Sequence, residues 1–447
     1  FNSQPYEFGQ TCWAQGMVRQ RLGDLHGAEA ALLEANQLFS GLGNRFWQRR
    51  VLLALAVLAY AQGEVERAAA RLATVFAATE ATSAAEAPID WDQATLADAY
   101  LLQVRLYLAQ NNLTAAAQTL EILRSSVAPA SMDIESGLES LLPQVAVRLN
   151  HATGLVARAA AQPDGARRAL RSAIDLLERQ RATLPVEEVR AAFLDDKTAL
   201  YSDLVLTLLA EGSEEAQSEA FAIVERARSR TLLERLQTAL SPQTSNDDPQ
   251  ASRRLALQQE LHLLYNQLLG ESGTRSAGNT IQTAIARRET LLQRLEWRAP
   301  LPLAEAEPVD LAVLQQVLAP EQQAIAFYTA GNEVLAFVVS RTSLQTVRHL
   351  CTSDDLVAAV DEWCFQLGRA EVSPDYRQRH AERFAQSLLA ALHRLYELVM
   401  APLAHLLAAE RLLLIPHGVL HQAPLHALWT GHSFFLADYE CSYAPSA

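Results

Sequence analysis

Apolar residues recur at helical spacing through the chain up to about residue 180. Polar breaks with glycine or asparagine interrupt this pattern, at Gly23, Gly63 and Asn111, with a weaker copy at Gln162–Gly165. An alanine follows each break, at Ala28, Ala68, Ala116 and Ala166. Glycine and asparagine adopt the left-handed conformation that ends a helix, and alanine lets the next helix approach closely. The pattern therefore predicts successive helix pairs over residues 1–183.

A second helical region is predicted over residues 184–300. It contains a helical pattern at 186–210, a break at Gly212 and a strong amphipathic helix at 220–240. Apolar residues at steps of three and four follow, at Leu257, Leu261, Leu264, Leu268, Ile281, Ile285, Leu292 and Leu295. They predict an antiparallel helical hairpin with a coiled-coil-like seam, which we expect to be internal packing and not a partner site.

The period changes in residues 301–447. Two β-branched and aromatic runs, 324–329 and 334–340, flank Gly331-Asn332, which predicts a β-hairpin. The other expected elements are helices at 311–318, 354–367 and 377–398, and strands at 344–350, 412–415 and 434–443. Helices alternating with strands predict a mostly parallel sheet covered on both faces. The predicted fold class is multidomain: an N-terminal all-α repeat array, a helical connector and an incomplete C-terminal α/β domain.

Two motifs near the end of the sequence carry a family resemblance. An apolar strand runs into the pattern Pro-x-Gly-x-Leu-x-x-x-Pro-x-x-x-Leu, formed by Pro416, Gly418, Leu420, Pro424 and Leu428. The second motif is Tyr-x-Pro-Ser, formed by Tyr443, Pro445 and Ser446. Together they resemble the start of the core of CHAT domains, caspase-like peptidase relatives that usually follow tetratricopeptide repeats. The resemblance implies a caspase-like fold for residues 301–447.

The resemblance extends upstream. Residues that match the helix ahead of CHAT domains are Glu225, Arg228, Arg230, Leu232 and Leu236, and residues that match the opening hairpin are Tyr328, Leu335, Phe337 and Val338. The helix pairs resemble tetratricopeptide repeats, although the spacings of 40 residues from Gly23 to Gly63 and 48 to Asn111 exceed the usual period of about 34. A plain helical bundle is the alternative for this region.

Glu225 and Arg228 stand three residues apart, so their side chains can meet on one face of the predicted helix. We expect a solvent-exposed ion pair of little energetic weight. The alternative is a contact that fixes the peptidase domain.

In the family, the catalytic His of a His-Gly motif and the catalytic Cys both follow Tyr-x-Pro-Ser, and this sequence ends at Ala447. We therefore expect a fragment that stops before the catalytic pair, without peptidase activity of its own, and we assign no catalytic residue. The resemblance implies a bacterial signalling protein whose repeats bind a protein or peptide partner and regulate a cysteine peptidase. The alternative is a non-catalytic interaction scaffold with a degenerate CHAT-like domain.

Several residues near the end resemble site residues. Zinc prefers imidazole ligands, and four histidines lie close together in the sequence, at His417, His421, His426 and His432. Their spacing repeats on no helical face and no carboxylate completes a zinc motif, so we predict no metal. His417-Gly418 mimics the catalytic dipeptide but precedes Tyr-x-Pro-Ser. Cys441 lies in an apolar run, where a free thiol acts as a small buried hydrophobe. No glycine-rich phosphate loop is visible, so we predict no cofactor.

Composition narrows the function classes further. The formal net charge of -14 disfavours nucleic acid as a partner, because phosphate binding needs clustered Lys and Arg. The longest apolar run, 51–61, is far shorter than the roughly 20 residues of a membrane span. The four cysteines are scattered, and no signal peptide is visible. This pattern predicts a reduced, cytoplasmic protein.

Overall fold

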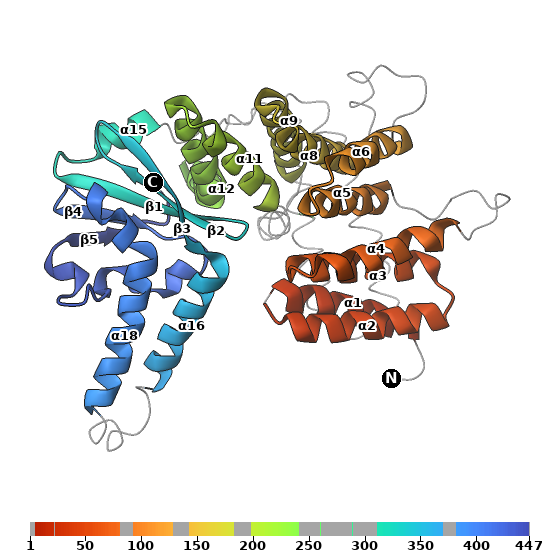
Figure 1. Ribbon diagram of the computed structural model, residues 1–447, viewed down its shortest axis with the longest axis horizontal. Helices are drawn as coiled ribbons and strands as arrows, with labels where there is room; N and C mark the ends of the chain where they lie inside the picture. Colours follow the sequence, from red (N-terminus) through yellow and green to blue (C-terminus); the bar gives the residue numbers. More distant parts are fainter. Residues whose placement is uncertain are drawn as a thin grey trace. The chain divides into compact units, whose positions relative to one another are not determined.

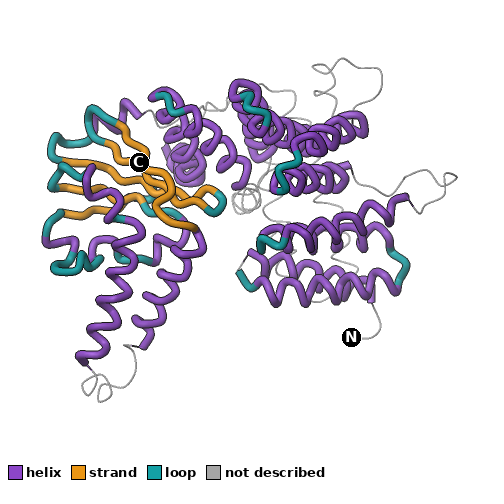
Figure 2. Tube along the Cα trace, in the orientation of Figure 1, coloured by secondary structure: helices purple, strands orange, loops and turns teal. Residues whose placement is uncertain are grey.

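A computed structural model describes residues 5–21, 23–80, 93–127, 143–182, 198–240, 260, 288, 311–369 and 381–446. The chain divides into two compact units, Phe1–Glu178 and Arg179–Ala447. In the described residues, the first unit is helical and every strand belongs to the second unit (Figures 1 and 2). None of the described helices combines the length and the apolar character that a membrane crossing requires.

The first unit consists of helices that pack in pairs (Figure 1). They are α1 (Pro5–Arg21), α2 (Leu25–Gly41), α3 (Arg45–Ala61), α4 (Val65–Glu80), α5 (Gln93–Ala109), α6 (Leu113–Val127), α8 (Pro143–Ala159) and α9 (Pro163–Ala182). Helix α1 packs on α2, α3 on α4 and α5 on α6. Gly154 brings α8 against α9, because a Cβ at this position would lie 2.5 Å from Leu170 Cγ.

Each pair repeats one set of buried contacts. A small or β-branched residue of the first helix faces an alanine, a leucine and a further apolar residue of the second helix, always at the same spacing. The four sets are Gly16, Ala28, Leu32 and Ala35; Ala56, Ala68, Leu72 and Val75; Val104, Ala116, Leu120 and Leu123; and Gly154, Ala166, Leu170 and Ala173. At Gly16 a Cβ would lie 2.7 Å from Leu32 Cγ, so the helices touch there through backbone.

The turns inside the pairs confirm three of the four predicted breaks. Gly23, Gly63 and Asn111 have φ angles of 80°, 76° and 57°. In the fourth pair the left-handed residue is Ala161, with φ 55°, whereas Gly165 lies inside α9, so the prediction was wrong there. The reason is spacing. In every pair the left-handed residue lies two positions before the first residue of the second helix. The second helix of the fourth pair begins at Pro163, so its left-handed residue is Ala161.

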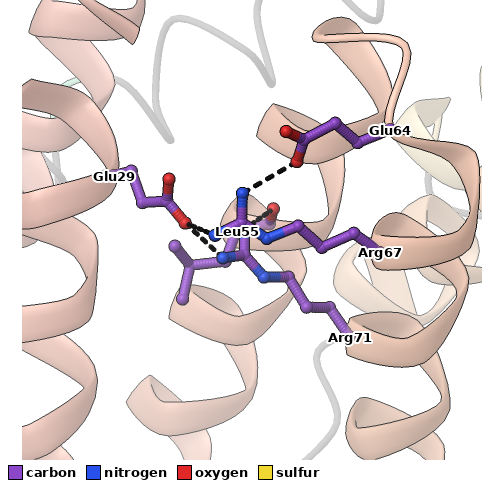
Figure 3. Close-up of polar contacts among 5 residues, drawn as sticks. All are labelled: Glu29, Leu55, Glu64, Arg67 and Arg71. Carbon is purple, nitrogen blue, oxygen red and sulfur yellow. Dashed lines mark hydrogen bonds and ion pairs between the residues drawn. The ribbon is translucent and has the colours of Figure 1, made fainter. Parts of the chain in front are cut away.

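One carboxylate joins the first two pairs (Figure 3). Glu29 on α2 accepts hydrogen bonds from Nη2 of both Arg67 and Arg71 on α4. Arg67 Nη1 also donates to Glu64 at 2.8 Å, and Arg71 Nη1 donates to the carbonyl of Leu55 at 2.9 Å. These charge-assisted hydrogen bonds to the Glu29 carboxylate connect the α1–α2 pair to the α3–α4 pair.

The described residues of the second unit form five strands in the order β3-β2-β1-β4-β5. They are β1 (Gln322–Ala330), β2 (Glu333–Val339), β3 (Leu344–Thr352), β4 (Arg411–Ile415) and β5 (Glu440–Tyr443). Strands β1, β2 and β3 pair antiparallel, whereas β1, β4 and β5 pair parallel. The predicted hairpin at Gly331 is confirmed, but the prediction of a mostly parallel sheet was wrong. A tight turn can only return the chain antiparallel, so the hairpin strands make the sheet mixed.

Helices cover both faces of this sheet, as predicted (Figure 1). The described helices of this unit are α11 (Thr198–Glu211), α12 (Glu214–Leu240), α15 (Leu311–Val317), α16 (Ser353–Arg369) and α18 (Ala381–Val399). On one face, Leu356 of α16 and Leu395 of α18 share a core with Phe327. On the other face, Phe221 of α12 lies 5.6 Å, ring to ring, from Phe337 of β2.

The last predicted strand is shorter than expected. β5 begins at Glu440, whereas the apolar pattern begins at Phe434. A 3₁₀ turn, η4 (Phe435–Ala437), takes the first part, and it buries Phe435 against Tyr439 with 4.7 Å between ring centroids.

Three further 3₁₀ turns are η1 (Ala401–Leu406), η2 (Gly418–Gln422) and η3 (Leu425–Ala427). The predicted hairpin seam at 257–295 lies outside the described residues, apart from Glu260 and Arg288. Arg288 Nε donates to Glu260 Oε2 at 2.7 Å.

Candidate functional site

The carboxyl ends of the parallel strands β1, β4 and β5 share one edge of the sheet. Tyr328 lies near the end of β1, His417 follows the end of β4, and Tyr443 is the last residue of β5. In open α/β sheets, ligands bind beyond the carboxyl ends of the strands. This edge is therefore the candidate functional site.

Tyr328 and His417 are in direct contact at this edge. Their ring centroids are 4.7 Å apart, with 43° between the planes. The backbone N–H of Thr329 donates to His417 Nδ1 at 3.2 Å, so the proton of the neutral ring lies on Nε2. Burial, together with the charges of Arg228 and His421, lowers the pKa of His417 to about 4. His417 is consequently a neutral, structurally engaged imidazole at neutral pH.

An ion pair from α12 lies next to these two rings. Arg228 Nη1 donates to Glu225 Oε1 at 2.9 Å. The Glu225 side chain is fully buried, and that of Arg228 is 6% exposed. The predicted solvent-exposed pair is therefore wrong. The reason is tertiary: α12 packs on α11 and on the sheet (Figure 1), and Arg228 interacts electrostatically with Tyr328 of β1 and with His417 after β4.

Burial has the electrostatic effects expected of such a pair. It lowers the pKa of the Arg228 guanidinium, while the charge of Glu225 and the nearby Tyr328 oppose this shift. Burial also raises the pKa of Tyr328, whose hydroxyl lies 3.3 Å from the hydroxyl of Ser202 on α11. Two helices and two strand ends thus converge on one buried polar cluster, formed by Ser202, Glu225, Arg228, Tyr328 and His417.

A second tyrosine–histidine pair lies at the end of β5. The Tyr443 hydroxyl accepts from the backbone N–H of His426 at 3.0 Å and lies 2.9 Å from His426 Nδ1. Either the hydroxyl or Nδ1–H is the donor between these two atoms, according to the tautomer of the His426 ring. Burial raises the pKa of Tyr443. This pair is more exposed than the first, with 45% of Tyr443 accessible.

The other predicted histidines lie apart from these pairs. His421 is exposed, and His432 Nδ1 lies 3.2 Å from the hydroxyl of Thr430. Within the described ranges, no group of three or more His, Cys, Asp or Glu side chains is placed to hold a metal ion.

Cys441 lies on β5 and is partly buried. Burial raises the pKa of its thiol, and Sγ lies 3.8 Å from the carbonyl oxygen of Tyr439. Burial also raises the pKa of Cys351, to about 11. Nucleophilic cysteines need the opposite shift. In the part of the chain that the structure describes, no thiol hydrogen-bonds to an imidazole.

Sequence reasoning did not identify this cluster. The sequence predicts Glu225 and Arg228 as an ion pair and gives Tyr328 as a match to a family segment, but it does not place these residues beside His417. No sequence pattern indicated that Ser202 takes part in a site, because serines are common in predicted helices. Proximity between α11, α12 and the strand ends arises from tertiary packing alone.

Comparison with known proteins gives one family match. A search of curated proteins found no match. The family model described as the CHAT domain matches residues 389–447. This range includes β4, β5 and both His417 and Tyr443, while Arg228 and Tyr328 precede it. A CHAT domain, which belongs to a caspase-like, peptidase-related family, is thus present in the C-terminal part of this chain.

Proposed function

We propose that this chain is a tetratricopeptide–CHAT protein, in which helical repeats bind a protein or peptide partner and regulate a caspase-like cysteine peptidase domain. The observation that carries the proposal is the match of residues 389–447 to the CHAT domain. The acidic net charge of -14 favours a protein partner over a nucleic acid. We further propose a cytoplasmic location and a signalling role.

The helix pairs of the first unit support the repeat part of the proposal. All four pairs place an alanine at one position of the second helix, and Ala28, Ala68, Ala116 and Ala166 are all fully buried. A left-handed residue precedes each of them at the same distance. Pairs that share one packing scheme stack into arrays whose surfaces bind extended segments of other proteins.

The buried cluster supports a regulatory role for α12. Both members of the buried ion pair lie on α12, and the charge of Arg228 acts on Tyr328 and His417 of the sheet. Any shift of this helix would change the surroundings of Tyr328 and His417 at the strand ends. Partner binding that moves α12 would thereby act on the CHAT domain.

The second candidate function is a non-catalytic interaction scaffold. Its support is confined to the described residues, where burial raises the pKa of the Cys351 and Cys441 thiols and so makes both poor nucleophiles. Under this alternative, the repeats still bind a partner, but the α/β part serves only as a structural domain.

A capture experiment tests the proposal. The full chain is immobilised and partners are identified against two baits, residues 1–178 and 179–447, which correspond to the two compact units. We expect a protein that is retained by the full chain and by residues 1–178. Retention by residues 179–447 alone would count against recognition by the repeats.

A further inference from the structure

The guanidinium of Arg228 has two buried donors without a partner among the described residues. Nη1 is bound to Glu225, but neither Nε nor Nη2 has a hydrogen-bond partner among the described residues, and both atoms are closed off from solvent. Buried donors without partners are rare, because each forfeits its hydrogen bonds to water without replacement. Two such donors on one charged group are an unusual feature in a side chain that is 6% exposed.

The Nε–Nη2 edge of other arginines in this protein holds a carboxylate. Arg348 Nε and Nη2 donate to the two oxygens of Glu333 at 2.8 and 2.7 Å. Arg148 Nε and Nη2 bind both oxygens of Asp98 in the same way. Nε–H and one Nη2–H point in parallel, and their spacing matches a carboxylate, which makes this pairing bidentate and strong.

A guanidinium can hold a second carboxylate while it keeps its first. Arg411 shows this, since its Nη1 donates to Glu321 at 3.2 Å and its Nε donates to Glu440 at 3.1 Å. Arg228 has the first half of this arrangement, with Nη1 on Glu225. Its Nε and Nη2 donors, which would form the second half, have no partner among the described residues.

We propose that the Nε–Nη2 edge of Arg228 is a binding site for a carboxylate group at the carboxyl ends of β1 and β4. Neighbouring groups suit this ligand. The hydroxyl of Tyr328 and the Nε2–H of His417 are donors close to the guanidinium, and His417 is uncharged at neutral pH. The carboxylate of Glu225 lies at the opposite Nη1 end of the guanidinium, and a second carboxylate, that of Asp203, acts on Tyr328.

The carboxylate can come from a small organic acid or from an acidic side chain of a peptide. In either case entry requires a movement of α12 or of the turn at His417, because Nε and Nη2 are closed off from solvent. Binding is therefore expected to be slow and to stabilise one position of α12. The inference does not depend on peptidase activity or on partner binding by the helix pairs.

The test uses the full chain labelled with ¹⁵N-arginine. The Nε–H resonance of Arg228 is assigned by its loss in Arg228→Lys, and the chain is titrated with acetate against chloride at equal ionic strength. Two capped tripeptides, one with a central Glu and one with a central Gln, distinguish a side-chain carboxylate from a free acid. We expect a saturable change of this resonance with acetate or the Glu peptide, and none with chloride or the Gln peptide.

Variants provide the second measurement. In thermal unfolding, the carboxylate probe should raise the midpoint of the unmodified chain and of the control Arg348→Lys. Arg228→Lys keeps the positive charge but loses the parallel Nε and Nη2 donors, so the affinity of this variant for the carboxylate probe should fall roughly tenfold or more. The same response to chloride and acetate, or a crystal structure grown in acetate with only a water on the Arg228 edge, would overturn the proposal. If Arg228→Lys fails to fold, the crystal structure of the unmodified chain grown in acetate decides, because an acetate on the Nε–Nη2 edge supports the proposal and a water alone overturns it.

Discussion

The imidazole of His417 lies against the ring of Tyr328, with 4.7 Å between the ring centroids. The contact joins the end of β1 to the turn after β4, and the hydrogen bond from the Thr329 N–H to His417 Nδ1 fixes the orientation of the imidazole. Arg228 of α12 adds a charge next to both rings. Helix, strand and turn are therefore coupled through one buried polar cluster, and the following predictions test its parts.

Acid should destabilise the second unit through His417. Its pKa is about 4 in the folded protein, because burial disfavours the charged ring, against about 6.5 in an unfolded chain. Between these values the unfolded state binds more protons, so stability is full above pH ~6.5 and falls as the pH drops toward 4. The loss should reach the order of 3 kcal/mol. Urea unfolding at several pH values measures it.

The matched variants for this prediction are His417→Asn and His432→Asn. His432 is exposed and bonds only locally to Thr430. Its variant should keep the pH dependence of the unmodified chain, whereas His417→Asn should flatten it between pH 6.5 and 4. Equal pH profiles for the unmodified chain and His417→Asn would contradict the assignment.

Removal of the Arg228 side chain should strongly destabilise the chain. Arg228→Met leaves the buried carboxylate of Glu225 without this partner, which costs about 3–5 kcal/mol in comparable buried pairs. The double variant Glu225→Gln/Arg228→Met should lose less than Arg228→Met alone, because no unpaired charge then remains. The free energy of unfolding in urea is the measurement.

The control is an exposed pair of the same spacing. Arg124 Nη1 donates to Glu121 at 2.6 Å, and 65% of the Glu121 side chain is exposed. Arg124→Met should change stability by only a few tenths of a kcal/mol. Equal losses for the two arginine variants would show that the Glu225–Arg228 pair behaves as a surface pair.

The close contact between paired helices should tolerate no side chain at Gly154. A Cβ there would lie 2.5 Å from Leu170 Cγ, so Gly154→Ala should cost about 1–3 kcal/mol through overpacking. Gly41 is the control, since a Cβ at this position meets nothing within 4 Å. Gly41→Ala should leave the thermal midpoint of the chain unchanged or slightly raised. A tolerated Gly154→Ala would argue against this packing scheme.

The chain as given should not cleave peptides through Cys441. Burial raises the pKa of this thiol, and no described imidazole is placed to deprotonate it. We expect no turnover of a peptide panel by the purified chain, measured by mass spectrometry. Turnover that disappears in Cys441→Ala would refute this expectation, while turnover that persists in Cys441→Ala would point to a contaminating peptidase.

Local features of the fold could be predicted from the sequence. Gly23, Gly63 and Asn111 identified turns because few residues adopt a positive φ without cost. Gly331 identified the hairpin for the same reason. Ala161 was missed, because an alanine carries no such signal and its conformation follows from the position of Pro163.

Long-range relationships could not be predicted. The spacing of Glu225 and Arg228 is the same in an exposed pair and in a buried one, as the Glu121–Arg124 pair illustrates. The burial of the Glu225–Arg228 pair depends on which elements pack on α12, and the local sequence pattern does not predict this packing. The mixed order of the sheet likewise depends on the parallel pairing of β4 with β1, although β2 and β3 lie between them in the sequence.

The most direct test of the account is the affinity of a captured partner for the two units. Isothermal titration calorimetry compares the full chain, residues 1–178 and residues 179–447 as binders of that protein. The account predicts equal dissociation constants for the full chain and residues 1–178, and no binding by residues 179–447. Binding by residues 179–447 with the affinity of the full chain, or none by residues 1–178, would contradict it.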